Sequence, residues 1–184
     1  MAAAPVQKAP LNRSSWSPVN FAPRRSTTWS MNCWWISSCS DFSRANLTGV
    51  EIVGADFTST SFANAVLTGA EAQGASFVRA NLSRANLSGG ELHGVNFNGA
   101  TLIEADFSGS ELFGATLANV RAAGADFSDA EINASNLTHG DFTGASFRDS
   151  SLDGARLTGG VFSRADFRDA SLRRTDIRGA DLSG

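Results

Sequence analysis

The chain has 184 residues and a formal charge of −3, with 18 glycines, 13 phenylalanines and no tyrosine. All 18 acidic residues lie at or beyond Asp41, so residues 1–40 carry +4 and residues 41–184 carry 11 − 18 = −7. This excludes a surface that is basic throughout, so we expect no direct nucleic-acid binding. No apolar run approaches the ~20 residues that a membrane span needs.

Residues 1–40 contain no acid and are rich in Ser and Pro, with Lys8, Arg13, Arg24 and Arg25 as their basic residues. This composition is typical of an organelle transit peptide, and the arginine pair also suggests a twin-arginine export signal without its apolar core. A disordered leader is the interpretation that we prefer. We therefore favour a cytoplasmic protein, whereas cleavage of this segment would indicate a plastid or thylakoid protein or an exported one.

The end of the leader precedes the first regular repeat of the chain. Terminal repeats of a stacked array are atypical because they must cover its first apolar cross-section. We therefore predict that residues 28–40 lie across the first coil, with Trp34 or Trp35 as the plug.

Residues 41–184 follow a five-residue period. From Phe42 to Leu182, every fifth residue is Leu, Phe or Ile in 27 of 29 cases, the exceptions being Ala72 and Ala122. Five residues advance a helix by about 140° net, which would scatter these side chains around its axis. In a flat strand an odd period would alternate between the two faces. The chain must therefore turn one corner in each repeat.

A second period of twenty residues sets the number of sides. Like residues that recur at this spacing would stack in ladders along one side of a coil. Four pentapeptides then close one square coil, and residues 41–184 form about seven coils, ~4.8 Å apart. The fold class is an all-β solenoid, a quadrilateral β-helix. The recurrent residues include Glu51, Glu71, Glu91, Glu111 and Glu131.

The residue two positions before each large apolar residue is small, with Ala in 17 of 28 cases. Both positions point inward, where a square coil has little room, and a larger second residue would overpack it. We predict local under-packing at Ala72 and Ala122, where the large side chain is missing.

Five units show the repeat most clearly and resemble the A(D/N)LXX unit of pentapeptide-repeat proteins. The resemblance covers residues 41–184 and implies a right-handed quadrilateral β-helix; the handedness comes from the resemblance alone. It also implies a function, because some members of the family mimic duplex DNA and bind DNA gyrase, which they protect from quinolones. These units are Ala45-Asn46-Leu47, Ala55-Asp56-Phe57, Ala80-Asn81-Leu82, Ala125-Asp126-Phe127 and Ala180-Asp181-Leu182.

The outward positions carry the candidate sites. Carboxylates stacked about 4.8 Å apart repel by roughly 1 kcal/mol per pair in water, so the glutamate ladder is a candidate partner-binding face, together with Phe113. The alternative is that glutamate was simply duplicated with the repeat. Charge changes along the chain, from 4 − 11 = −7 over residues 41–131 to 7 − 7 = 0 over residues 132–184. A candidate basic end consists of Arg164, Arg168, Arg173, Arg174 and Arg178.

Catalysis is not expected, nor is a cofactor or a metal ion, because a filled coil offers no pocket. The only histidines, His93 and His139, fall on different sides. The first hypothesis is a non-catalytic structural or protein-interaction module that binds another protein. The alternative is a DNA-mimicking binder of DNA gyrase or another topoisomerase through the acidic face. An uncapped last coil would expose strand edges, so end-to-end pairing of two copies is also expected.

Overall fold

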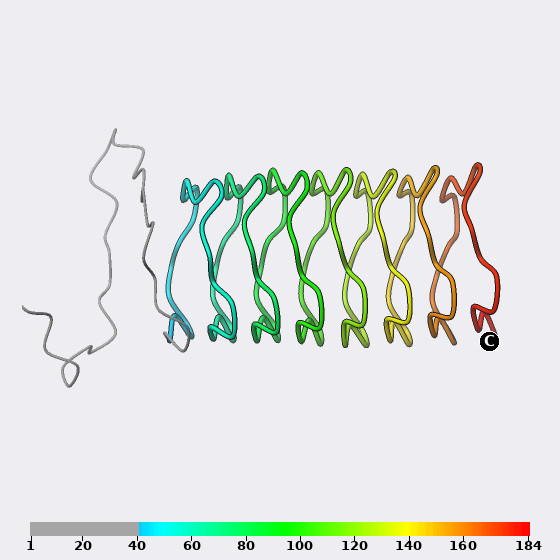
Figure 1. Cartoon of the computed structure of the whole chain (residues 1–184), viewed down its shortest axis with the longest axis horizontal. Helices are drawn as coiled ribbons and strands as arrows, with labels where there is room; N and C mark the ends of the chain where they lie inside the picture. Colours follow the sequence, from blue (N-terminus) through cyan, green and yellow to red (C-terminus); the bar gives the residue numbers. More distant parts are fainter. Residues whose placement is uncertain (1–40) are drawn as a thin grey trace, which may run out of the picture.

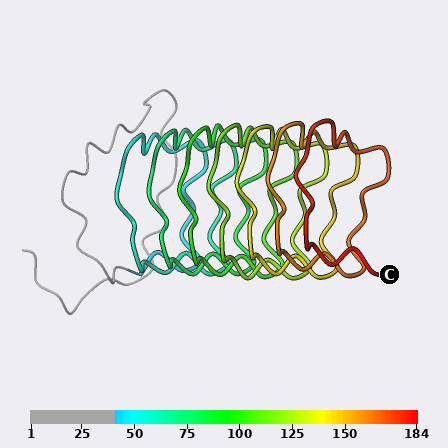
Figure 2. The same ribbon diagram turned by 45° about the vertical axis from the view of Figure 1, so that its right-hand side comes forward.

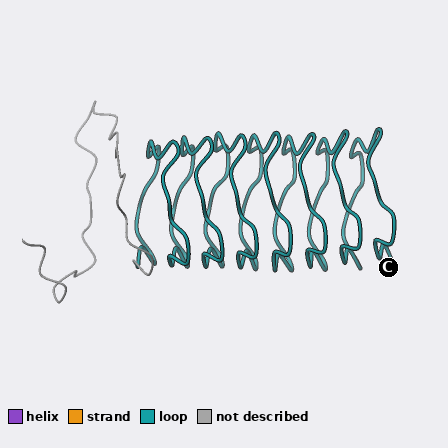
Figure 3. Cartoon of the chain, viewed as in Figure 1, coloured by secondary structure: helices purple, strands orange, loops and turns teal. Residues whose placement is uncertain are grey.

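The computed structural model describes residues 41–184, and over this range the chain forms neither helices nor extended strands (Figure 3). Single residues instead form parallel β-bridges with residues twenty positions further on, from Asp41–Ser61 to Val161–Asp181. Turns of twenty residues therefore stack along one axis and build what we call the rod (Figure 1). The predicted β-solenoid and its twenty-residue period are confirmed.

The rod has four sides, which we number by the bridge residues of the first described turn. Side 1 begins at Asp41, side 2 at Asn46, side 3 at Glu51 and side 4 at Asp56, and each side recurs every twenty residues. The turns keep this register along the whole rod, as the view rotated by 45° shows (Figure 2). Residues on one side therefore form straight columns.

Backbone hydrogen bonds explain why a chain without long strands holds together. The N–H of Phe77 donates to the carbonyl of Asn96 in the next turn at 2.7 Å, and the N–H of Ala80 donates back to the carbonyl of Phe77 at 3.0 Å. The first bond links two turns, and the second closes the corner. Equivalent pairs recur along the rod, so most backbone donors are satisfied without a conventional sheet.

The interior contains the two inward positions of each repeat, as the sequence predicts. Every large position from Phe62 to Phe162 is at most 1% exposed. On side 2 the aromatic rings stack along the axis, with centroids 4.9 to 5.1 Å apart and nearly parallel planes. Offset stacking of this kind adds to the hydrophobic gain from burial. The stacked rings are Phe107, Phe127, Phe147 and Phe167.

The two alanines that replace large residues, Ala72 and Ala122, are both buried. In the turn that contains Ala72, the rings of Phe62 and Phe77 approach edge to face at 5.4 Å. The expected under-packing at the two alanines stays a prediction.

The expectations for residues 1–40, including the plug at Trp34 or Trp35 and the targeting signals, concern residues outside the range that the structure describes. Within residues 41–184, no helix has the length and apolar character needed to cross a bilayer.

Candidate interaction face

The glutamate ladder is present on side 3 as predicted. Parallel bridges join each ladder glutamate to the next, from Glu51–Glu71 to Glu111–Glu131, and the column then continues with Ser151 and Ser171. The last four glutamates are exposed, and Glu51 is half-buried. Because consecutive bridge residues stack at the strand spacing of ~4.8 Å, the carboxylates form one row along the rod.

A second column runs beside the ladder, two residues after each bridge residue. Two of its members reach the next turn: Gln73 donates from Nε2 to Glu91 Oε2 at 2.5 Å, and His93 Nε2 lies 2.8 Å from Glu111 Oε2. We call the two columns together the acidic face. It comprises Glu51, Glu71, Glu91, Glu111 and Glu131 with Val53, Gln73, His93, Phe113 and Asn133.

Apolar side chains interrupt the acidic face at two points. Val53 and Phe113 are each 56% exposed. Phe113 follows Glu111 by two residues, so an aromatic ring stands in solvent beside the carboxylate row. The sequence had indicated this combination of Phe113 with the ladder, and the structure places both on side 3.

Over its first four turns, each corner that borders the acidic face contains a glycine. A Cβ atom added at any of these eight glycines would meet nothing within 4 Å. At these glycine positions, no side chain separates the backbone of the rod from a partner. The glycines are Gly49, Gly69, Gly89 and Gly109 on one edge and Gly54, Gly74, Gly94 and Gly114 on the other.

Beyond Glu131, side 3 becomes a chain of internal hydrogen bonds. Asn133 Oδ1 accepts from the Ser151 hydroxyl at 2.6 Å. Asp153 Oδ1 accepts from the Ser171 hydroxyl at 2.6 Å and from the Arg173 N–H at 2.8 Å. These bonds, led by the one from Ser171, lower the pKa of Asp153. This part of side 3 therefore satisfies its own polar groups.

The candidate basic end is less basic than its arginine count suggests. Arg168 donates from Nε to Asp166 at 2.8 Å, and Arg178 donates from Nε to Asp176 at 2.8 Å. The bond from Arg168 lowers the pKa of Asp166 to about 2, and the one from Arg178 holds the pKa of Asp176 well below its usual range. Among residues 41–184, Arg164, Arg173 and Arg174 form no ion pair.

Sequence reasoning missed these pairs, although their signal is simple. In an Asp-x-Arg unit, the residues before and after the large apolar residue both point outward on one side. The same spacing explains a second missed feature, in which a hydroxyl two residues on donates to an Asn or Asp. Thr48 donates to Asn46 Oδ1 at 2.7 Å, for example. Such local bonds brace the corners.

The described part of the chain gives no support to a metal site. In residues 41–184, no three His, Cys, Asp or Glu side chains are grouped so that they could hold an ion. His93 lies on side 3 and His139 at a corner of side 4, where its ring lies against Gly159.

Comparisons with known proteins agree with this architecture. The family model for pentapeptide repeats matches the chain in eight copies, over residues 40–77, 60–99, 80–117, 110–149 and 145–184. No curated protein sequence matches the chain. Among solved structures, the chain is similar to HetL, a pentapeptide repeat protein involved in heterocyst differentiation regulation in the cyanobacterium Nostoc. The two are 30% identical over 78% of this chain and 73% of HetL, with a TM-score of 0.51.

Two other solved structures are more distant. One is a pentapeptide repeat protein from the Arabidopsis thaliana thylakoid lumen, 27% identical over 71% of this chain and 70% of that one, with a TM-score of 0.39. The other is QnrB1, a plasmid-mediated fluoroquinolone resistance protein, 25% identical over 78% of this chain and 82% of that one, with a TM-score of 0.39.

Proposed function

Because the chain belongs to the pentapeptide-repeat family, we propose that it is a non-catalytic interaction module that binds another protein through the acidic face. The complementary partner surface is basic and contains an apolar site. The backbone hydrogen bonds between turns keep the rod rigid, so the face is formed before the partner arrives and little conformational entropy is lost on binding.

The exposed ring of Phe113 is the observation that carries the proposal. It lies beside Glu111, the fourth of the five ladder glutamates, and 56% of its surface remains in water. Aromatic side chains that a partner buries contribute a large share of the binding energy at an interface. The surrounding carboxylates would steer a basic partner and select its orientation, which is the usual contribution of charge at an interface.

Three charges of the ladder can be removed with little change of shape. In the variant Glu71→Gln, Glu91→Gln, Glu111→Gln, we expect loss of the proteins that the wild-type chain retains in a pull-down from the cells that produce it. Phe113→Ser should weaken the same interaction, because it removes the anchor and keeps every charge. Retention of the same partners by both variants would contradict the proposed face.

A matched control removes three carboxylates from other sides of the rod. The variant Asp106→Asn, Asp126→Asn, Asp141→Asn has the same net charge as the ladder variant. Each asparagine keeps the side-chain oxygen that accepts the local hydrogen bond, for example from the N–H of Ser108 to residue 106, at 2.9 Å. This control should bind as the wild type does; an equal loss would mean that overall charge decides binding rather than side 3.

The second candidate function is binding to DNA gyrase or another topoisomerase as a DNA mimic. The observation that favours it is the uninterrupted row of five stacked glutamates, because a regular line of negative charge resembles one edge of a duplex. A supercoiling assay with and without a quinolone tests it. The candidate predicts altered supercoiling or protection from the drug, and no effect at micromolar protein removes it.

A further inference from the structure

The acidic face has five carboxylates and no lysine or arginine over the turns that bear its glutamates, residues 41–140. Side 2 of the same turns has three acids and no exposed aromatic ring, whereas side 3 also presents Phe113, which is 56% exposed. Uncompensated negative charge and an exposed ring therefore coincide on side 3. The arginines of these turns belong to sides 1 and 4, and they are Arg44, Arg79, Arg84 and Arg121.

The complementary charge lies in the same chain, before the rod. Residues 8–25, which we call the basic segment, contain four basic residues and no acid. Their charge of +4 nearly offsets the −5 of the ladder. Trp16 and Phe21 stand among these cations, so the segment combines the positive charge and the aromatic side chains that the acidic face would recognise. An arginine can also bind over an exposed ring such as that of Phe113 by cation–π attraction.

The chain between the basic segment and the rod is long enough for this contact. Asp41 begins side 1 of the first described turn, and Glu51 lies on side 3 of that same turn. From there the ladder extends over four steps of ~4.8 Å, or ~19 Å in all. Arg25 precedes Asp41 by 41 − 25 = 16 positions, and a chain of this length spans up to about 50 Å when extended. Arg25 can therefore reach every ladder glutamate, even if residues 28–40 cross the first turn as the sequence predicts.

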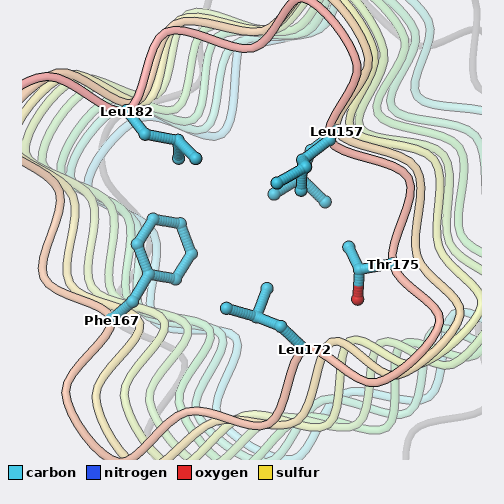
Figure 4. Close-up of a pocket in the computed structure, with 6 residues that line it drawn as sticks. Leu157, Phe167, Leu172, Thr175 and Leu182 are labelled. Carbon is cyan, nitrogen blue, oxygen red and sulfur yellow. The ribbon is translucent and has the colours of Figure 1, made fainter.

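The last described turn also exposes apolar side chains, but its charge does not attract a basic segment. Residues 165–184 contain four arginines and four aspartates, so their net charge is 4 − 4 = 0. This turn also lies at the opposite end of the rod from Asp41 (Figure 1). Charge and distance therefore both favour the acidic face. Figure 4 shows the apolar side chains of this turn around a common hollow, which is lined by Leu157, Phe167, Leu172, Thr175, Ile177 and Leu182.

We propose that the basic segment binds the acidic face of its own rod and that a partner protein must displace it. Its arginines contact the ladder carboxylates, and its aromatic side chains pack on Phe113. The connection through residues 26–40 gives the segment an effective concentration on the order of millimolar, so weak contacts suffice to keep it bound. This regulation rests on the proposed function, because both occupants use the same face, but the contact within the chain needs no partner and is tested without one.

Tryptophan fluorescence of the 184-residue chain can follow the basic segment, because all four tryptophans precede Asp41. The background Trp29→Phe, Trp34→Phe, Trp35→Phe retains only Trp16, and its melting temperature will show that the rod is folded. We expect acrylamide to quench Trp16 at least twofold less in this background than after the three glutamine substitutions of the ladder variant are added. High salt should remove the difference by screening the charges. The charge-matched asparagine control should leave Trp16 as protected as in the background.

Equal quenching with and without the ladder substitutions would overturn the proposal, as would an equal loss of protection in the asparagine control. Protection of Trp16 that increases with protein concentration would indicate binding to the face of a second copy, and it would overturn the contact within one chain.

A labelled synthetic peptide of residues 8–25 tests whether the segment occupies the face. In the full chain, the variant Arg13→Gln, Arg24→Gln, Arg25→Gln should leave the face open. We therefore expect this variant to bind the peptide at least fivefold more tightly than the wild type does, as measured by fluorescence anisotropy. The control Arg44→Gln, Arg121→Gln, Arg156→Gln has the same net charge, and these arginines form no ion pair within residues 41–184.

This control should bind the peptide as the wild type does. Equal affinity of the wild type and the Arg13→Gln, Arg24→Gln, Arg25→Gln variant would overturn the proposal, and so would an equal gain in the control, since overall charge would then explain the binding. The two proposals can fail separately. Protection of Trp16 that depends on the ladder supports the contact within the chain, even if the ladder variant retains every wild-type partner in a pull-down, which would contradict the proposed function alone.

Discussion

Ala134 and Gly154 occupy the same corner of side 3 in consecutive turns, and both have a left-handed backbone, with φ of 56° and 73°. An L-residue such as alanine is strained in this region by about 1–2 kcal/mol, whereas glycine is not. The rod therefore stores strain at Ala134 that the next turn avoids.

Exchanging these residue types should change stability in opposite directions. We expect Ala134→Gly to raise the free energy of unfolding by about 0.5–1 kcal/mol, after allowing for the greater freedom of glycine in the unfolded chain. Gly154→Ala should lower it by a similar or larger amount. A Cβ at residue 154 meets no atom within 4 Å, so crowding cannot cause that loss. Urea unfolding measures both; equal signs for the two changes would contradict the explanation.

Thr60 has a buried hydroxyl that makes no hydrogen bond within the described residues. The side chain is 1% exposed, and its Oγ1 has no hydrogen-bond partner among the described residues. Thr60→Val keeps the shape and removes the unsatisfied group, so we expect a gain of about 1 kcal/mol in the free energy of unfolding. Thermal and urea unfolding would show it, and a loss of stability would mean that the hydroxyl is satisfied.

The matched control for this substitution is Ser110, at an equivalent inward position. Its hydroxyl donates to the carbonyl of Phe107 at 2.7 Å. Ser110→Ala removes a hydrogen bond that is made, so it should lower the free energy of unfolding by about 1 kcal/mol.

Glu71 lies between two ladder glutamates, Glu51 and Glu91, and its side chain has no partner in residues 41–184. Glu71→Gln should hold or raise the melting temperature at low salt because it removes repulsion on both sides. Glu104→Gln is the comparison, since Glu104 accepts a charge-assisted bond from Arg84 at 2.7 Å, and there we expect a decrease. A clear decrease for Glu71→Gln would show that the ladder does not repel itself.

Acid should destabilise the rod. Hydrogen bonds lower the pKa of six aspartates, to about 2 at Asp166 through its bond from Arg168. In the unfolded chain these groups titrate near 3.9, so the unfolded state binds more protons between that value and the folded pKa. The contribution of these aspartates to the free energy of unfolding is therefore fully present above about pH 5 and is lost as the pH decreases towards 2. The six are Asp41, Asp56, Asp153, Asp166, Asp176 and Asp181.

Urea unfolding at pH 5 and pH 3 checks this direction, and an NMR titration of Asp166 checks its cause. Arg168→Gln should raise the pKa of Asp166 towards its ordinary value and reduce the loss of stability between the two pH values. Equal stability at pH 5 and pH 3 would contradict the prediction.

The buried positions of the fold could be predicted from the sequence because nearly every repeat has a small residue followed, two positions later, by a large apolar residue. Phe127 and Ala125 are buried for the same steric reason as their equivalents in every other turn, and a period without insertions sets the register of the ladder. Repetition thus replaces the information that an ordinary fold takes from long-range packing.

The outward half could not be predicted to the same depth. The contact between His93 and Glu111 requires a side chain to lean towards the next turn, and the pair Asp166–Arg168 requires one to bend along its own side. Neither direction follows from the period. The orientation of the Thr60 hydroxyl is a third example, because Ser110 and Ser150, at equivalent inward positions in other turns, donate to carbonyls.

The bridges join residues twenty positions apart, so the rod has two spacings: the five-residue repeat sets the buried positions, and the twenty-residue turn sets the side on which each residue lies. Removal of one whole turn, such as residues 91–110, would leave every later residue on its own side and shorten the acidic face by one glutamate. Removal of a single pentapeptide would also preserve the buried positions, but it would rotate all that follows by one side and carry Glu111 and Glu131 away from the ladder. A repeat protein of this kind can therefore lose or gain five residues and keep its core. The columns of outward side chains on its four sides stay aligned only when whole turns of twenty residues are lost or gained.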